Sequence, residues 1–440
     1  MVFWMLRRRG CGYDACSAEN VPAGRVGDGM LTPEYLNSFT DGYLGMCDIL
    51  NEQIAKDVAR RIAKTGKITP SAEWQLKQAQ QSGALMDDVV KDVSKLTDRS
   101  EEEIIAMFRD AGIEGMMNDA APLLEAGKIK KSEIVLSGAM KRTMEAAAEK
   151  CKGDISNLTL TTAAVTQQQF IQALNEAYMK VTSGAFSYQE AIRQALRITA
   201  KTGAYVLYDS GYQSKIDVAI RTAVLTGVNQ TAGKLTELYS ADLGAEYYET
   251  TAHPGARPSH AVWQGRICKI DGSTPDYPNF AEFTGYGTGA GLCGWNCRHS
   301  FYPYWPGISK PAYTKADLNE YKRAKFKYNG ERLTEYECMQ KQREYERSIR
   351  EYKRILASYD SYMSEAKDES TVMYLREEFV KESVKLKEKE RQMKEFCRQT
   401  NRRAKSERTQ VTAVLDKNGN LVSFNRSVSG KAVWAAKKGV

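Results

Sequence analysis

The sequence predicts a mainly α-helical protein: a long helical N-terminal region, a small α+β module rich in proline and glycine, a helical hairpin and a terminal β-hairpin. Proline placement is the first observation. Seven of the eleven prolines lie between Pro254 and Pro311, and none lies at 123–253 or from 312 to the end. Because proline inside a helix costs about 3 kcal/mol or more, helices are expected on both sides of that segment. Apolar residues at helical spacing in both flanking stretches support the same prediction.

Length and composition narrow the class of protein. A chain of 440 residues is too long for one ordinary core, which predicts two or three domains. Its 42% hydrophobic and 27% charged residues exclude a wholly disordered or membrane-embedded protein. No segment approaches the roughly 18 apolar residues of a membrane span, and the nine cysteines are scattered and odd in number. We expect a protein that folds in water and is made in a reducing cytoplasm.

The N-terminal region divides into a leader and a helical domain. Residues 1–29 lack periodicity, which predicts a leader outside the fold or a start assigned too early, with Met30 as the initiator. Residues 30–245 form the predicted helical domain. Hydroxyl side chains in capping positions predict four helix starts: Thr32 before Pro33, Thr69 before Pro70, Ser100 with Glu103, and Ser187 with Glu190. Glycines after periodic apolar residues predict three helix ends: Gly112, Gly184 and Gly203.

Residues 246–312 form the predicted irregular module. It opens with strand-forming residues at 246–252 and holds nine of the 33 glycines. The three tryptophans Trp263, Trp295 and Trp305 are expected to form its small core. Two phosphate-loop patterns, at 289–294 and 227–234, are set aside, because the first lacks a following helix and the second lacks the spacing and the hydroxyl of a true loop.

The module also gathers histidines and cysteines. All three histidines of the chain lie within it, near Cys268, Cys293 and Cys297. His260, Cys293, Cys297 and His299 are candidate ligands of a structural zinc, the one cofactor that the sequence suggests, although C-x3-C-x-H matches no standard zinc finger. Hydrogen-bonded histidines beside buried thiols are the alternative that the sequence favours. A nucleophilic Cys297 activated by His260 or His299 is a third, and nothing in the sequence supplies its geometry.

The C-terminal part carries most of the positive charge. The chain has 63 basic and 55 acidic residues, and the segment 312–408 alone has 25 basic and 19 acidic ones. Residues 313–408 predict a charged helical hairpin, because apolar residues recur by three and four or by seven. Its two seams are Tyr345, Ile349, Tyr352, Leu356, Tyr359 and Met363, and Val372, Phe379, Leu386 and Met393. Residues 409–440 predict a β-hairpin tail with Asn418-Gly419 at its turn.

Two motifs in the module carry a resemblance. The stretch His253-Pro-Gly-Ala-Arg257-Pro-Ser259-His260-Ala-Val-Trp263-Gln-Gly265 is followed by Gly294-Trp295-Asn296-Cys297-Arg298-His299. This pair resembles the motifs of the phage minor capsid protein 2 family, which is related to the Mu-type minor head proteins. Three upstream landmarks, at 30–36, 62–69 and 221–233, extend the resemblance over roughly residues 30–312. Many Mu-type relatives have cysteine where this chain has His299, which remains a possible metal ligand.

The resemblance implies a structural virion component with no catalytic activity. Such a protein is present in few copies, associates with the portal protein and other head proteins, and acts in head assembly or DNA packaging and ejection. It is synthesised in the host bacterial cytoplasm and resides in the phage head. Apart from the resemblance, the mixed-charge, net-basic hairpin can lie near packaged DNA without reading its sequence. Arg257 and Arg298 are expected to lock loops by donating hydrogen bonds.

A phage-delivered enzyme or toxin, a nuclease or transferase that uses the His/Cys module, is the alternative. Only three carboxylates, Asp271, Asp276 and Glu282, lie between the two motifs. Metal-dependent nucleases usually need more acidic ligands, which favours the structural class.

Overall fold

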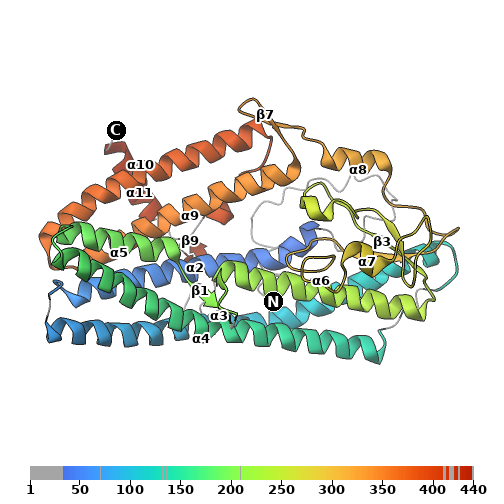
Figure 1. Ribbon diagram of the computed structural model, residues 1–440, viewed down its shortest axis with the longest axis horizontal. Helices are drawn as coiled ribbons and strands as arrows, with labels where there is room; N and C mark the ends of the chain where they lie inside the picture. The colour runs from blue at the N-terminus through green and yellow to red at the C-terminus, as the bar shows by residue number, and fades with distance from the viewer. Residues whose placement is uncertain are drawn as a thin grey trace.

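A computed structural model describes residues 33–438 except 70, 131–132, 135, 209, 410–412, 416–420 and 425–426. The predicted leader, residues 1–29, lies outside the described residues. Four long helices run side by side along the length of the molecule (Figure 1): α2 (Pro33–Thr65), α3 (Ala72–Glu125), α4 (Gly138–Thr182) and α6 (Ile216–Asp242). The fold is mainly α-helical with small antiparallel sheets, as predicted. Among the described helices, none has the length and apolarity needed to cross a membrane.

Local signals predict some helix ends and fail at others. Ser187 caps α5 (Tyr188–Thr202) by accepting a hydrogen bond from the Glu190 amide at 3.1 Å. Gly184 and Gly203 follow α4 and α5 with φ of 70° and 67°, which confirms both predicted ends. Helix α2 begins at the predicted Pro33.

Helix α3 corrects three of the predicted boundaries. It starts at Ala72 with Ser71 as the cap, so the start predicted after Thr69 is two residues too early. The start predicted at Ser100 and the end predicted at Gly112 are wrong, because α3 continues through both positions. Its long contact with α4 and α6 makes continuation of the helix more favourable than a local cap.

A short hairpin that the sequence analysis missed links α5 to α6. Strands β1 (Tyr205–Leu207) and β2 (Gln213–Lys215) pair antiparallel, with Val206 opposite Ser214. The Asn51 side chain of α2 accepts a hydrogen bond from the Ala204 amide at 2.7 Å. A side chain at Gly203 would place its Cβ 2.7 Å from Asn51 Oδ1, so this close approach requires glycine.

The irregular module contains a three-stranded antiparallel sheet in the order β4 (Ile267–Lys269), β3 (Tyr247–Thr250), β5 (Phe301–Tyr304). Beside it lie a 3-10 turn, η2 (Pro258–His260), and a short helix, α7 (Phe280–Thr284). Strand β3 confirms the predicted strand at 246–252.

The predicted tryptophan core of the module is wrong in part. Trp263 is buried, but Trp295 is 64% exposed and Trp305 is only half-buried. The rings of Tyr248, Phe280 and Phe301 fill the space instead, with centroids 4.7–4.9 Å apart. The sheet explains the difference: Tyr248 and Phe301 belong to paired strands, and their rings pack together beneath it.

The predicted helical hairpin is present, with narrower limits. Its helices are α9 (Glu335–Glu365) and α10 (Glu369–Gln399), and the residues before them form α8 (Lys315–Lys322), β6 (Phe326–Tyr328) and β7 (Glu331–Leu333). The β6–β7 turn has positive φ at Asn329 and Gly330, an Asn-Gly hairpin signal that the sequence analysis overlooked. Most seam residues are buried: Tyr345, Ile349, Leu356, Tyr359, Phe379, Leu386 and Met393.

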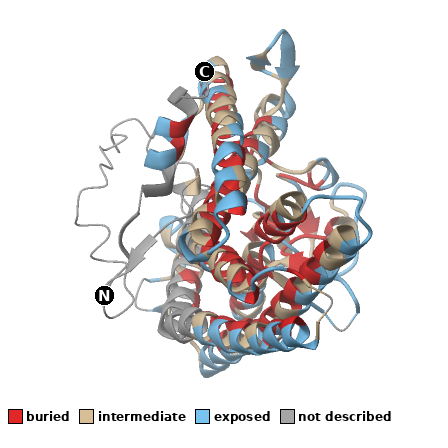
Figure 2. Ribbon diagram, turned by 90° about the vertical axis from the view of Figure 1, so that its left-hand side faces the viewer, coloured by how far each residue is buried: buried red, intermediate tan, exposed pale blue. Residues whose placement is uncertain are grey.

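The hairpin packs on the first half of the chain, through contacts of α9 with α2 and α5 and of α10 with α5. Buried residues gather on the sides of the helices that face one another (Figure 2). Arg350 of α9 pairs with the buried Asp48 of α2 at 3.0 Å, and Arg197 of α5 pairs with the buried Glu382 of α10. Helices α2, α5, α6, α9 and α10 contribute to one hydrophobic core. Helices from both sides of the module are therefore in direct contact. The predicted domain limits stay a prediction.

The tail contains the predicted β-hairpin and one further helix. Strands β8 (Ala413–Leu415) and β9 (Leu421–Phe424) pair antiparallel, and the turn at Asn418-Gly419 lies outside the described residues. Helix α11 (Ser427–Lys438) follows and was not predicted. It packs on α9 and α10, and Lys431 pairs with Asp360 of α9 at 2.7 Å.

Candidate functional site

The two motifs meet at one buried cluster in the module. Cys297 Sγ lies 3.6 Å from His260 Nδ1 and 3.6 Å from His299 Nδ1. These three ligand atoms lie within 4.8 Å of one another, and the three side chains are 1–2% exposed. Turn η2 positions His260, since Pro258 at its first position presets the helical φ. His299 stands two residues before β5. The structure therefore brings together three of the four predicted metal ligands.

The outer ring nitrogens of both histidines have hydrogen-bond partners. His260 Nε2 lies 2.9 Å from the Ala290 carbonyl oxygen, and His299 Nε2 lies 3.1 Å from Gln264 Oε1. The same Gln264 oxygen accepts a hydrogen bond from the His253 amide at 2.7 Å. Because both partners are acceptors, each Nε2 carries the proton and each Nδ1 turns a lone pair toward the Cys297 sulfur.

The fourth predicted ligand, Cys293, lies next to this group but outside it. Its sulfur is 3.7 Å from the His299 carbonyl oxygen, and that same oxygen lies 3.8 Å from Cys297 Sγ. His253 stacks on His299 with ring centroids 4.2 Å apart, and among the described residues its buried Nε2 has no hydrogen-bond partner. Cys268 belongs to the apolar core of the module, on β4 opposite Tyr248.

The two motif arginines hold the loops together. Arg257 Nη2 donates to the Trp295 carbonyl oxygen at 2.6 Å, and Arg298 Nη2 donates to the Gly255 carbonyl oxygen at 3.0 Å. Each guanidinium therefore reaches from one motif to the backbone of the other, which is the loop-locking contact predicted from the sequence.

The other motif residues have separate roles. Trp263 packs against both histidine rings, with centroids 4.7 Å from His260 and 4.8 Å from His299. Gly265 has a φ of 60°, and a Cβ there would lie 3.0 Å from Tyr313 Cβ, so a side chain is excluded. Ser259 is exposed on turn η2, and Trp295 projects to the surface.

Helix α6 supplies contacts that the sequence analysis did not assign. Asn229 is fully buried, and its Nδ2 donates to the carbonyl oxygens of Cys297 at 3.2 Å and His299 at 2.9 Å. Asn296 donates from its side chain to Thr222 Oγ1 at 2.9 Å and from its amide to Thr226 Oγ1 at 3.3 Å. All three helix residues fall in the upstream landmark at 221–233, which was the available signal.

In the metal-free cluster, burial determines which histidine and cysteine side chains carry a proton. It lowers the pKa of His253 to about 3, with help from Arg298 and His260. It also lowers the pKa of His299 far below its usual range and raises the pKa of the Cys297 thiol. Neutral imidazoles beside a protonated thiol are the opposite of the charged pair that a thiolate nucleophile needs.

The two phosphate-loop patterns are structural. Gly227–Lys234 lies inside α6, and a Cβ at Gly227 would lie 3.3 Å from Phe108. Gly291 packs so closely against Gly285 that a Cβ would fall 2.0 Å from the Gly285 carbonyl oxygen. Both sets of glycines therefore allow close packing, and neither pattern forms a phosphate-binding loop between a strand and a helix.

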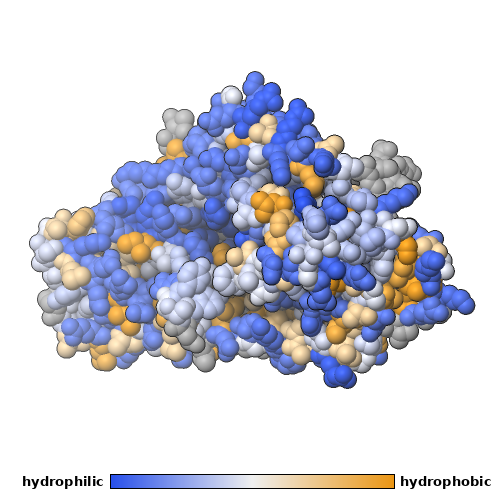
Figure 3. Space-filling view, turned by 45° about the vertical axis from the view of Figure 1, so that its right-hand side comes forward, coloured by the Kyte–Doolittle hydropathy of each residue, from blue (hydrophilic) through white to orange (hydrophobic). Residues whose placement is uncertain are grey.

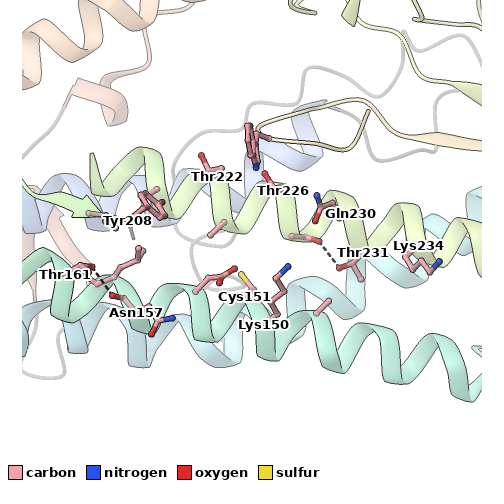
Figure 4. Close-up of a pocket in the computed structure, with 18 of the residues that line it drawn as sticks. Lys150, Cys151, Asn157, Thr161, Tyr208, Thr222, Thr226, Gln230, Thr231 and Lys234 are labelled. Atoms are coloured by element: carbon pink, nitrogen blue, oxygen red, sulfur yellow. Dashed lines mark hydrogen bonds between the residues drawn. The ribbon is translucent and has the colours of Figure 1, made fainter. Parts of the chain in front are cut away.

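A groove runs between α4 and α6 beside the module (Figure 4). It has a volume of about 910 Å³ and lies between Lys150 and Asp154 on α4 and Gln230 and Lys234 on α6. Lined by both charged and apolar side chains, it suits a polypeptide surface better than an apolar ligand.

Comparisons with known proteins agree with the resemblance. A protein named "Structural protein" of Lactococcus phage LL-H is 26% identical over 303 residues, which cover 65% of this chain and 77% of that protein. Another "Structural protein", of Lactococcus phage mv4, is 38% identical over 79 residues, which cover 18% of this chain and 54% of that protein. No solved structure matches the chain. The family model described as phage minor capsid protein 2 matches residues 31–398, further than the predicted 30–312. The chain belongs to the phage minor capsid protein 2 family.

Proposed function

We propose that this phage structural protein lies near the portal vertex of the head, contacts the portal protein and other head proteins, and acts in head assembly and in DNA packaging or ejection. The observation that carries the proposal is that residues of the family motifs make structural hydrogen bonds. Arg257, Arg298 and Asn296 all fasten loops to one another or to α6, so the motifs build a rigid end on an extended helical body.

The shape and surface support contacts with other proteins. Helix α3 has 54 residues and is therefore about 80 Å long, which offers an extended packing surface. Tyr208 and Trp295 line the groove between α4 and α6 while being 40% and 64% exposed. Exposed aromatic side chains beside a groove are typical of protein interfaces.

The charges on the hairpin of α9 and α10 support the proposal that this hairpin lies near packaged DNA. The upper part of the molecule is largely hydrophilic in Figure 3, and helices α9 and α10 lie in the upper part of Figure 1. Many of its charges are paired along the same helix, as in Arg391–Glu388 at 2.7 Å and Arg398–Glu395 at 2.6 Å. The remaining basic excess favours weak, salt-dependent contact with phosphates and no reading of sequence.

Difference imaging of virions tests the proposal. Phage heads made with and without this protein are compared by electron cryomicroscopy, with DNA content measured on the same particles. We expect difference density at the portal vertex and reduced packaging or infectivity without the protein. Density distributed over the whole shell, or in the tail, would contradict the proposed location.

A delivered enzyme is the second candidate, because Cys297 stands 3.6 Å from two histidine nitrogens. Burial argues against it: a substrate could not reach a sulfur that is 1% exposed without opening the module. Nuclease and transfer assays on the purified protein distinguish the delivered enzyme from the structural protein. An activity that Cys297→Ser abolishes is expected only of the enzyme.

A further inference from the structure

The cluster of Cys297, His260 and His299 has a geometry that hydrogen bonding alone does not explain. Both Nδ1 lone pairs face one sulfur, at 3.6 Å each. A thiol has one proton, so it can donate to only one of them. The other lone pair would face a sulfur atom inside a buried site, which is an unfavourable arrangement.

A zinc ion removes this conflict. Zinc binds cysteine sulfur at about 2.3 Å and histidine nitrogen at about 2.0–2.1 Å, so at a tetrahedral angle sulfur and nitrogen are about 3.6 Å apart. Both sulfur–nitrogen distances in the cluster are 3.6 Å. We propose that Cys297 Sγ, His260 Nδ1 and His299 Nδ1 bind one structural zinc ion, with Cys293 as the fourth ligand.

The surroundings fit an outer shell around such a site. Metal-binding histidines usually donate their second ring N–H to a carbonyl or carboxylate oxygen, which orients the ring. Ala290 O and Gln264 Oε1 occupy those positions for His260 and His299. The Trp263 indole packs against both rings and shields the site from solvent.

Charge balance and position assign the fourth ligand to Cys293. Two thiolates and two neutral imidazoles neutralise Zn²⁺, and a neutral centre costs least in a buried site. The Cys293 sulfur approaches the same His299 oxygen as the Cys297 sulfur, at 3.7 Å and 3.8 Å. His253 is the rival, since its buried Nε2 has no partner among the described residues.

Metal analysis of the purified full chain tests the site, independently of its location in the virion. We expect about one zinc per chain by elemental analysis. After removal of zinc by a chelator, added Co²⁺ should give tetrahedral visible bands and a sulfur-to-cobalt charge-transfer band. Cys297→Ser should lose both, while Cys268→Ser, a buried thiol of the same module, should keep them. A wild-type protein that carries no zinc and takes up neither Zn²⁺ nor Co²⁺ would overturn the site.

X-ray absorption spectroscopy of the zinc-loaded wild type tests the ligand set without any substitution. Two sulfur and two nitrogen ligands are expected, and a spectrum with no sulfur ligand would overturn the site. A single sulfur would overturn the assignment of Cys293. In the cobalt form, Cys293→Ser should reduce the sulfur-to-cobalt charge-transfer band to about half, while His253→Gln should leave it unchanged. An undiminished band in Cys293→Ser would overturn the assignment of Cys293.

Discussion

Replacing Asn229 with alanine tests whether α6 holds the motif loops in place. The Asn229 side chain is fully buried and donates to two buried carbonyl oxygens, those of Cys297 and His299. Alanine suits a helix at least as well as asparagine, so helix propensity does not oppose the change. The effect therefore reports the two hydrogen bonds.

The expected loss follows from those contacts. A buried acceptor left without its partner costs about 1–3 kcal/mol, so two of them cost about 2–6 kcal/mol. Asn229 Oδ1 is itself buried without a partner among the described residues, and its removal recovers part of that cost. We expect Asn229→Ala to destabilise the module by about 2–4 kcal/mol.

Hydrogen exchange followed by mass spectrometry measures this local effect. Peptides that span 293–301 should exchange about 30 to 1000 times faster in Asn229→Ala, because each 1.4 kcal/mol changes an equilibrium constant about tenfold. Gln230→Ala is the matched control, since Gln230 is the next residue of the helix and is exposed. Equal exchange in the two variants would refute the assigned role of Asn229.

Three further predictions concern stability measured by urea unfolding. Leu356→Asp places a charge in a fully buried seam and should cost several kcal/mol, whereas Met373→Asp, at a 64% exposed position, should change stability by less than about 0.5 kcal/mol. Burial raises the pKa of Asp119 to about 7, so its contribution to stability is full below about pH 3.8 and is lost as pH rises through 7. Asp119→Asn should therefore gain stability over the wild type as pH rises from 4 to 8, by at most about 4 kcal/mol, and a constant difference would contradict the titration. Gly265→Ala should cost more than Gly272→Ala, because both have positive φ but only Gly265 would place a Cβ 3.0 Å from another atom. Equal losses of stability in the two variants would contradict this, because they would show that Tyr313 moves away from the added Cβ at no cost.

Local interactions explain which helix limits could be predicted. The Ser187 hydroxyl bonds an amide three residues away, and Gly203 adopts positive φ directly after its helix. Such signals act within one turn and are visible in the sequence. The same kind of signal at Ser100 failed, because packing of α3 against two other helices favours continuation of the helix there.

The candidate site shows the same division. The motifs predicted that Arg257 and Arg298 would bond the loops, and that His260, Cys297 and His299 would lie near one another. They did not show that Trp295 faces outward while Phe280 and Phe301 fill the core. Side chains in irregular loops have no period, so their direction cannot be read from spacing.

The amino-acid sequence by itself determined the helical class, the hairpin seam and the membership of the family. These features depend on residue type and on spacing along one element. Only the tertiary structure decided that Asn229 reaches carbonyl groups 68 and 70 residues away, and that two histidine lone pairs meet at one sulfur. Those contacts depend on how the loops fold over α6, and a contact of about 3 Å between distant residues is set by packing that no local pattern encodes.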